Sequence, residues 1–250
     1  MLQAILHILK LVLFLPLLNL LVFFYHYIPD IGIVIIILTV ISRLVLLPSF
    51  HKSLKQQKTM QTLQPKIDEI KLKFKDDKPG EMQAMMELYK KHDFNPMSSC
   101  LPLLIQFPIL IALYQVFIRS LNGSQLSGLY SFVPKVGAIS PMFLHFLDLS
   151  KQSVVLAVAA AIFQHIQTRM ILPKRQIQDP TAKMTSYMTL YYLPLITIVL
   201  GVKIAFNLGG SVKHFGVGLP SGLVLYWVVT TLFSIGQQYY ILRKEAVESM

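Results

Sequence analysis

The sequence predicts an all-α polytopic membrane protein: a bundle of five transmembrane helices with a hydrophilic groove and a cytoplasmic helical hairpin. Three observations lead to this fold class. The 250 residues are 54% hydrophobic and 14% charged, whereas a soluble domain carries nearer a quarter charged residues. Five runs are apolar and about as long as the roughly 20 residues that a spanning helix needs. Lys and Arg gather between particular runs, as they do in loops on one side of a membrane.

The apolar runs divide the chain into spans and loops. We interpret Pro48 as a kink or a boundary, because proline removes a backbone donor. In chain order, we expect an N-terminal interfacial or extra spanning helix (1–30), a first span (31–50), a cytoplasmic hairpin (51–96), a second span (97–118), an outer loop (119–152), a third span (153–173), a cytoplasmic loop (174–183), a fourth span (184–206), an outer loop (207–218), a fifth span (219–242) and a cytoplasmic tail (243–250).

Two interpretations of the first 28 residues stay open. Gln3, His7 and Lys10 share one helical face and leucines share the other, which suits a helix lying in the membrane interface. The later part, through Phe24, is apolar all round and is close to the minimum spanning length. This segment is therefore either an interfacial helix or a sixth span.

The basic residues predict the orientation. The segment 51–96 holds ten lysines, and together with 169–183 and the tail this side carries sixteen Lys and Arg residues, against five in the opposite loops. Basic loops face the cytoplasm. We therefore expect the hairpin and the C-terminus to be cytoplasmic.

The hairpin is predicted from helical periodicity. Apolar residues from Met60 to Phe74 recur at steps of three and four, and a second helical face follows a break at 76–80, as two packed helices require. The segment has a net charge of +3, which suits weak docking to lipid headgroups, ribosomal RNA or an acidic partner. The alternative is a charged connector that only enforces topology. The candidate contact residues are Lys66, Lys71, Lys73, Lys75, Met85 and Met86.

Arg43 is a charged residue within the first apolar run. It lies seven residues before the end of the first predicted span, roughly 10 Å inside at 1.5 Å per residue. A central arginine costs about 2.5 to 3.5 kcal/mol on insertion scales, so it marks a functional site. The five runs contain no Asp or Glu, which leaves hydration and neutral polar groups as its partners. Snorkelling to the headgroups is the alternative.

Neutral polar residues of the other spans gather at the depth of Arg43. Thr39 lies one turn before it, and the outer half of the runs is poor in such residues. This distribution favours a wet cavity that is open to the cytoplasm and closed on the outer side. For any single residue, an ordinary hydrogen bond between helices is the competing interpretation. The candidate groove residues of this depth include Thr39, Gln106, Gln167 and Gln237.

Motifs for catalysis or cofactor binding are missing from the sequence. Cys100 is the single cysteine and the seven histidines are scattered, so no spacing typical of a metal site occurs. There is no nucleotide motif, no nucleophile beside a base and no nucleic-acid-binding motif. We therefore expect a protein that is not an enzyme, has no cofactor and no metal, and does not bind DNA.

Several segments together resemble one family, the YidC/Oxa/Alb insertases. IIILTVISRL at 35–44 with Pro48 is similar to the first core span of that family, and LQPKI at 63–67 and MMELYK at 85–90 to its hairpin. The second and fifth spans are represented by NP at 95–96, CLPLLIQFPI at 100–109, LPSGLVLYW at 219–227 and the pair Gln237–Gln238.

This resemblance implies a groove centred on Arg43 with Thr39, and with Gln167 and Trp227 in its wall, although composition alone would assign Trp227 to packing. It implies an insertase and chaperone of the bacterial inner (plasma) membrane that acts on nascent membrane proteins in the lipid bilayer, alone or with the Sec translocon and the ribosome. Without a large periplasmic domain, the chain looks like a short bacterial form. A solute transporter or channel and a structural scaffold are the competing functions.

Overall fold

The structure is a computed structural model and describes residues 3, 7, 10–121, 128–172, 180–202 and 219–248. The predicted loop 207–218, most of the loop 174–183 and the side chain of Cys100 lie outside the described residues. The elements are the π-helix η1 (Lys10–Phe14), α2 (Leu15–Tyr27), α3 (Ile31–Val45), α4 (Leu47–Lys73), α5 (Lys78–Lys91), α6 (Pro96–Leu121), the antiparallel strands β1 (Met142–Phe143) and β2 (Leu147–Asp148), α7 (Val154–Ile171), α8 (Pro180–Tyr187), the π-helix η2 (Met188–Tyr192), α9 (Leu193–Gly201) and α10 (Ser221–Glu248).

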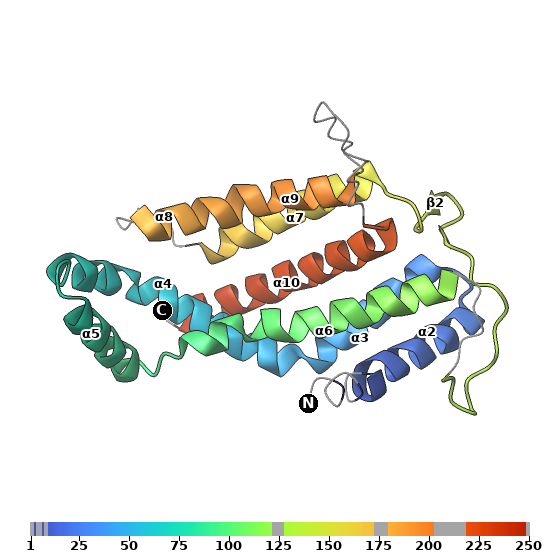
Figure 1. Cartoon of the computed structure of the whole chain (residues 1–250), viewed down its shortest axis with the longest axis horizontal. Helices are drawn as coiled ribbons and strands as arrows, with labels where there is room; N and C mark the ends of the chain where they lie inside the picture. Colours follow the sequence, from blue (N-terminus) through green and yellow to red (C-terminus); the bar gives the residue numbers. More distant parts are fainter. Residues whose placement is uncertain are drawn as a thin grey trace.

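The helices form an elongated bundle with different ends. In Figure 1, α10 lies between the pair α7 and α9 and the pair α3 and α6, and it contacts α3, α6 and α7. The α4–α5 hairpin projects from one end, and the strands lie at the opposite end. We call these the hairpin end and the strand end.

The all-helical membrane class is confirmed. Within the part of the chain that the structure describes, three helical segments are long and apolar enough to cross a bilayer: Lys10–Tyr27, Val154–Ile171 and Lys183–Gly201. A bent pair, α3 with α4, meets the same test and raises the number to four. The division of the chain into five spans stays a prediction.

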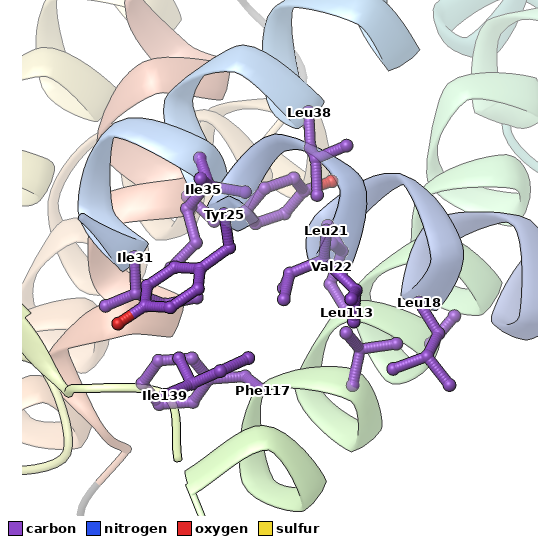
Figure 2. Close-up of a cluster of buried hydrophobic side chains, with 14 of the residues drawn as sticks. Leu18, Leu21, Val22, Tyr25, Ile31, Ile35, Leu38, Leu113, Phe117 and Ile139 are labelled. Atoms are coloured by element: carbon purple, nitrogen blue, oxygen red, sulfur yellow. The ribbon is translucent and has the colours of Figure 1, made fainter. Parts of the chain in front are cut away.

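The N-terminal helix packs against the bundle. Leu18, Leu21 and Val22 of α2 are at most 1% exposed, and they point toward α6, whose Leu113 and Phe117 belong to the same core cluster (Figure 2). This packing uses one face of α2, while Gln3, His7 and Lys10 before it are exposed. Both interpretations of this segment stay open, because it packs on protein and is also long enough to span.

A sharp bend lies within the first predicted span. The helix α3 ends at Val45, and α4 begins at Leu47 at an angle of 67°. Pro48 lies in the first turn of α4, where its missing N–H does no harm. It cannot donate to the carbonyl four residues earlier, so the ladder of α3 cannot continue through it. The bend thus coincides with the kink or boundary expected at Pro48, and the border between the first span and the hairpin stays a prediction.

The strand end of the bundle is closed by the segment 128–153. Asp30 caps α3 by accepting hydrogen bonds from the amides of Gly32 and Ile33, at 2.9 and 3.1 Å, and from the amide of Leu144 in the β1–β2 turn at 2.6 Å. At the start of α10, the amide of Ser221 donates to the carbonyl of Lys151 at 2.8 Å. The covering loop thus bonds to the capping side chain of α3 and to the first backbone amides of α10.

The helix α2 is tied to the same loop. Asn19 is 3% exposed; its amide nitrogen donates to the Gly128 carbonyl at 3.1 Å, and its oxygen accepts from the Tyr130 amide at 2.7 Å. The hydroxyl of Tyr25 accepts from the amide of Ser140 at 2.9 Å. These bonds join the N-terminal helix and the covering loop in one packed unit.

The hairpin consists of two helices that share a small apolar core. Leu63 and Ile67 of α4 are buried with Phe94, and Met85 and Tyr89 of α5 pack against them. The turn between the arms comprises residues 74–77, close to the predicted break, and α4 continues through Pro65. The periodic apolar residues of the first arm therefore pack on the second.

Candidate functional site

A cavity of about 360 Å³, lined by both polar and apolar side chains, lies among the helices near the junction of α3 and α4. It is partly open and is bordered by α3, α4, α6, α7 and α10. We call it the groove. Its described lining residues are Arg43, Phe50, Ser53, Leu54, Gln57, Gln106, Phe107, Leu110, Gln167, Ile171, Tyr226, Trp227, Thr230, Thr231, Ser234, Gln237 and Gln238.

Arg43 is held at the wall of the groove by two neutral contacts. It lies in the last turn of α3, where the partial negative charge of a helix end favours a cation. A guanidinium nitrogen donates to the side-chain oxygen of Gln106 at 3.0 Å, and the guanidinium carbon lies 4.4 Å from the ring centre of Phe50. An aromatic face at this distance attracts a cation. Among the described lining residues Arg43 is the one charged side chain.

Gln106 connects the guanidinium to the fifth predicted span. Its oxygen accepts from Arg43, and its amide nitrogen donates to the hydroxyl of Tyr226 on α10. Both ends of this amide are therefore engaged, which fixes its orientation. Gln106 positions Arg43 at the groove wall.

The structure brings together five of the six predicted groove residues. Arg43, Gln106, Gln167, Trp227 and Gln237 line the groove. Thr39 does not line it: this residue is fully buried, and its hydroxyl donates to the Ile35 carbonyl of its own helix at 2.6 Å. A threonine in a helix can satisfy itself in this way, so Thr39 supports the helix behind Arg43 instead of facing the groove.

Sequence reasoning missed two neighbours of the arginine. Phe50 was placed at the end of the first span and was not singled out; it lies just after the 67° bend, with its ring against the guanidinium of Arg43. Tyr226 precedes Trp227 and was not singled out. Its signal was the spacing, because Tyr226, Thr230 and Ser234 follow one another at steps of four residues, which places them on one helical face.

Two glutamines of the groove are among the side chains with unused hydrogen-bonding capacity. The side-chain oxygens of Gln57 and Gln238 are buried and have no partner within the part of the chain that the structure describes. The amide nitrogen of Gln57 donates to Ser53 at 3.3 Å, so only one end of that amide is engaged. A buried acceptor without a donor costs about 1 to 3 kcal/mol. The groove therefore suits water or a polar ligand more than dry packing.

The predicted hairpin contact residues lie away from the groove. The Nζ atom of Lys66 lies 3.3 Å from Nε2 of His92, and the Nζ atom of Lys73 lies 5.6 Å from the ring centre of Phe74. Lys75 is exposed. Lys71 lies near Tyr89: burial raises the pKa of the Tyr89 hydroxyl, and the Lys71 charge opposes this rise.

The two predicted methionines differ from each other. Met85 packs in the hairpin core, whereas Met86 is 54% exposed. Of this pair, Met86 is therefore the one available to a partner. Among the residues that the structure describes, no group of His, Cys, Asp and Glu could hold a metal ion.

The fold and the groove define a class: a multi-pass helical membrane protein with a polar recess around a single buried guanidinium. The comparisons with known proteins identify the family. The chain belongs to the family described as "60Kd inner membrane protein", whose pattern matches residues 23–248. This membership confirms the resemblance seen in the sequence and a location in the inner membrane. It also agrees with the prediction that the chain is not an enzyme.

Similar proteins carry a more specific description. "Membrane protein insertase YidC" from Geotalea uraniireducens (strain Rf4) is 37% identical over 229 residues, which cover 90% of this chain and 36% of that protein. The protein of the same description from Citrifermentans bemidjiense is 34% identical with the same coverage. The chain therefore spans little more than a third of the length of these curated relatives.

A solved structure has a similar fold. "Active YidC insertase crystal structure with the first transmembrane domain resolved" is 28% identical to this chain with a TM-score of 0.59. The match covers 88% of this chain and 45% of that one. The helical arrangement of this chain is thus that of a YidC structure.

Proposed function

We propose that this chain is a membrane protein insertase, in which the groove receives a polar segment of a nascent membrane protein while the apolar residues of that client move into lipid. The observation that carries the proposal is Arg43, a buried guanidinium held by Gln106 and Phe50 at the wall of a polar cavity. The description of the relatives as insertases supports it.

The mechanism follows from the cost of moving polar groups into hydrocarbon. An unsatisfied backbone group in lipid costs several kcal/mol, and a charged side chain costs about 2.5 to 3.5 kcal/mol on insertion scales. A wet recess with a fixed positive charge lowers this cost for a carboxylate or a polar tail. No covalent step and no nucleotide is needed, since the transfer of apolar residues to lipid drives the insertion.

The groove works from one side in this proposal. Its lining residues on α3, α4 and α7 lie toward the hairpin end, those on α10 begin at Tyr226, and the covering loop 128–153 packs on the strand end. With ten lysines in 51–96, the hairpin end faces the cytoplasm. Arg43 then lies in the inner leaflet, within reach of a client that arrives from the cytoplasm.

The partners in this proposal are nascent membrane proteins, the lipid bilayer and, at the hairpin, the ribosome and the Sec translocon. Lys66, Lys71, Lys73 and Lys75 provide positive charge for such contacts, and Met86 provides exposed apolar area. The hairpin is a recruiting surface and the groove is the site of transfer.

The proposal is tested by charge reversal in reconstituted vesicles. Arg43→Glu is expected to reduce insertion of a single-span client with an acidic outer tail about tenfold or more, because attraction becomes repulsion. Arg43→Ala is expected to have a smaller effect. Arg169, an exposed arginine of α7 that is not among the groove residues, provides the control Arg169→Glu. Insertion of the acidic client by Arg43→Glu at the wild-type rate would refute the proposed mechanism.

A further inference from the structure

The hydrogen-bonding pattern of the groove points to more than the recognition of charge. Gln106 is engaged at both ends of its amide, by Arg43 and by Tyr226. Gln57 and Gln238 differ, because each presents a buried oxygen without a donor among the described residues. Both line the same cavity as Arg43, one from α4 and one from α10. The groove therefore combines spare acceptors with the donors of a guanidinium.

A ligand that matches this pattern must donate as well as accept. A carboxylate satisfies Arg43, but it has no hydrogen to offer to the oxygens of Gln57 and Gln238. A peptide group carries one N–H donor and one carbonyl acceptor. The cavity of about 360 Å³ holds on the order of ten waters at about 30 Å³ each, which is room for a short stretch of backbone.

We infer that the groove binds the main-chain amides of an extended client segment, with Gln57 and Gln238 accepting peptide N–H groups and Arg43 donating to a carbonyl or carboxylate. The inference rests on the proposed function and deepens it by naming the recognised chemistry. Every client has backbone N–H and C=O groups, and leaving them unpaired in lipid costs free energy. Recognition of these groups lets one groove serve clients of unrelated sequence.

The experiment compares two neutral clients in vesicles that contain the full chain. Each client has one apolar span, and its tail consists either of glycine or of N-methylglycine, which lacks the N–H donor. The wild-type chain is expected to insert the glycine tail about fivefold better, the effect of about one lost hydrogen bond, after subtraction of insertion into protein-free vesicles.

The two glutamines are then replaced together. In Gln57→Met with Gln238→Met, the preference for glycine is expected to disappear. The control is Gln61→Met, one turn further along α4 and not among the groove residues; it is expected to keep the preference. Far-ultraviolet circular dichroism and the thermal melting temperature of the purified double variant report that it is folded.

The outcomes separate this inference from the proposed function. Equal insertion of the two neutral tails by the wild-type chain, while the acidic client is inserted, overturns amide recognition and leaves the insertase proposal standing. A glycine preference that survives in the double variant also overturns it. If the double variant instead loses bound anionic phospholipid and its tail preference is unchanged, the site is a headgroup site. If no client is inserted, the proposed function itself fails.

Discussion

At the scale of single residues, the charge of Arg43 depends on the neutral groups that contact it and on the lack of an acidic side chain among the described groove residues. Arg43 is 6% exposed, and its contacts are an amide oxygen and an aromatic ring. Neither contact cancels its charge, so the positive potential remains available to a ligand. A carboxylate at the position of the Gln106 oxygen, 3.0 Å away, would instead form a buried ion pair.

Gln106→Glu tests this point. The new carboxylate is expected to neutralise Arg43 and to lower insertion of an acidic-tail client about tenfold, while insertion of a neutral-tail client changes less than twofold. The measurement is the ratio of the two insertion yields in vesicles. Gln61→Glu, outside the groove lining, serves as the control for added charge. An unchanged ratio in Gln106→Glu would show that the free charge of Arg43 is not what the acidic client senses.

At the scale of elements, the junction of α3 and α4 shapes the groove. The 67° bend turns the first residues of α4 back over the end of α3, which places Phe50 on Arg43 and Gln57 in the lining. Pro48 explains why the first helix stops, since it cannot donate to the ladder. Pro65, in contrast, lies within a continuous α4, so proline alone does not impose a bend there.

Replacement of Pro48 and of Pro65 tests whether the proline itself or the packing of neighbouring helices causes the bend between α3 and α4. Pro48→Ala is expected to let α3 continue and to lengthen the distance between spin labels at positions 37 and 62, toward the roughly 37 Å of a straight helix. Pulsed electron resonance measures this distance, with labels on introduced cysteines in a background without Cys100. Pro65→Ala is expected to leave it unchanged. If Pro48→Ala also leaves it unchanged, tertiary contacts and not the proline hold the bend.

At the scale of the whole molecule, the two ends of the bundle differ in structure. At the strand end, backbone amides of the covering loop donate hydrogen bonds to the side chains of Asp30, Asn19 and Tyr25. The groove and its unused acceptors lie near the junction of α3 and α4. We expect the groove to have no path to the strand end, in contrast to a channel, which needs a path to both faces of the membrane.

This asymmetry predicts one-sided access. Gln167 is half-buried in the groove lining, and a cysteine at this position is expected to react with a membrane-impermeant thiol reagent from the hairpin side only. Val116, which is fully buried in the core, provides the control Val116→Cys, expected to be unreactive from both sides. The readout is labelling in sealed vesicles, again without Cys100. Labelling of position 167 from the strand side would contradict this one-sided access.

The sequence by itself determined the properties that depend on composition and local spacing. Apolar runs and helical steps predicted the membrane class and the two arms of the hairpin, and the lack of acids in those runs singled out Arg43. These features are local, because hydropathy and helical periodicity act within one segment.

Only the tertiary structure decided which polar groups meet. It turned Thr39 toward its own helix, brought Phe50 and Tyr226 to the site, and left the oxygens of Gln57 and Gln238 without donors among the described residues. The physical reason is that the rotation and bend of each helix follow from packing against its neighbours. Residue spacing places a side chain on a face of its helix, but it does not say what that face contacts.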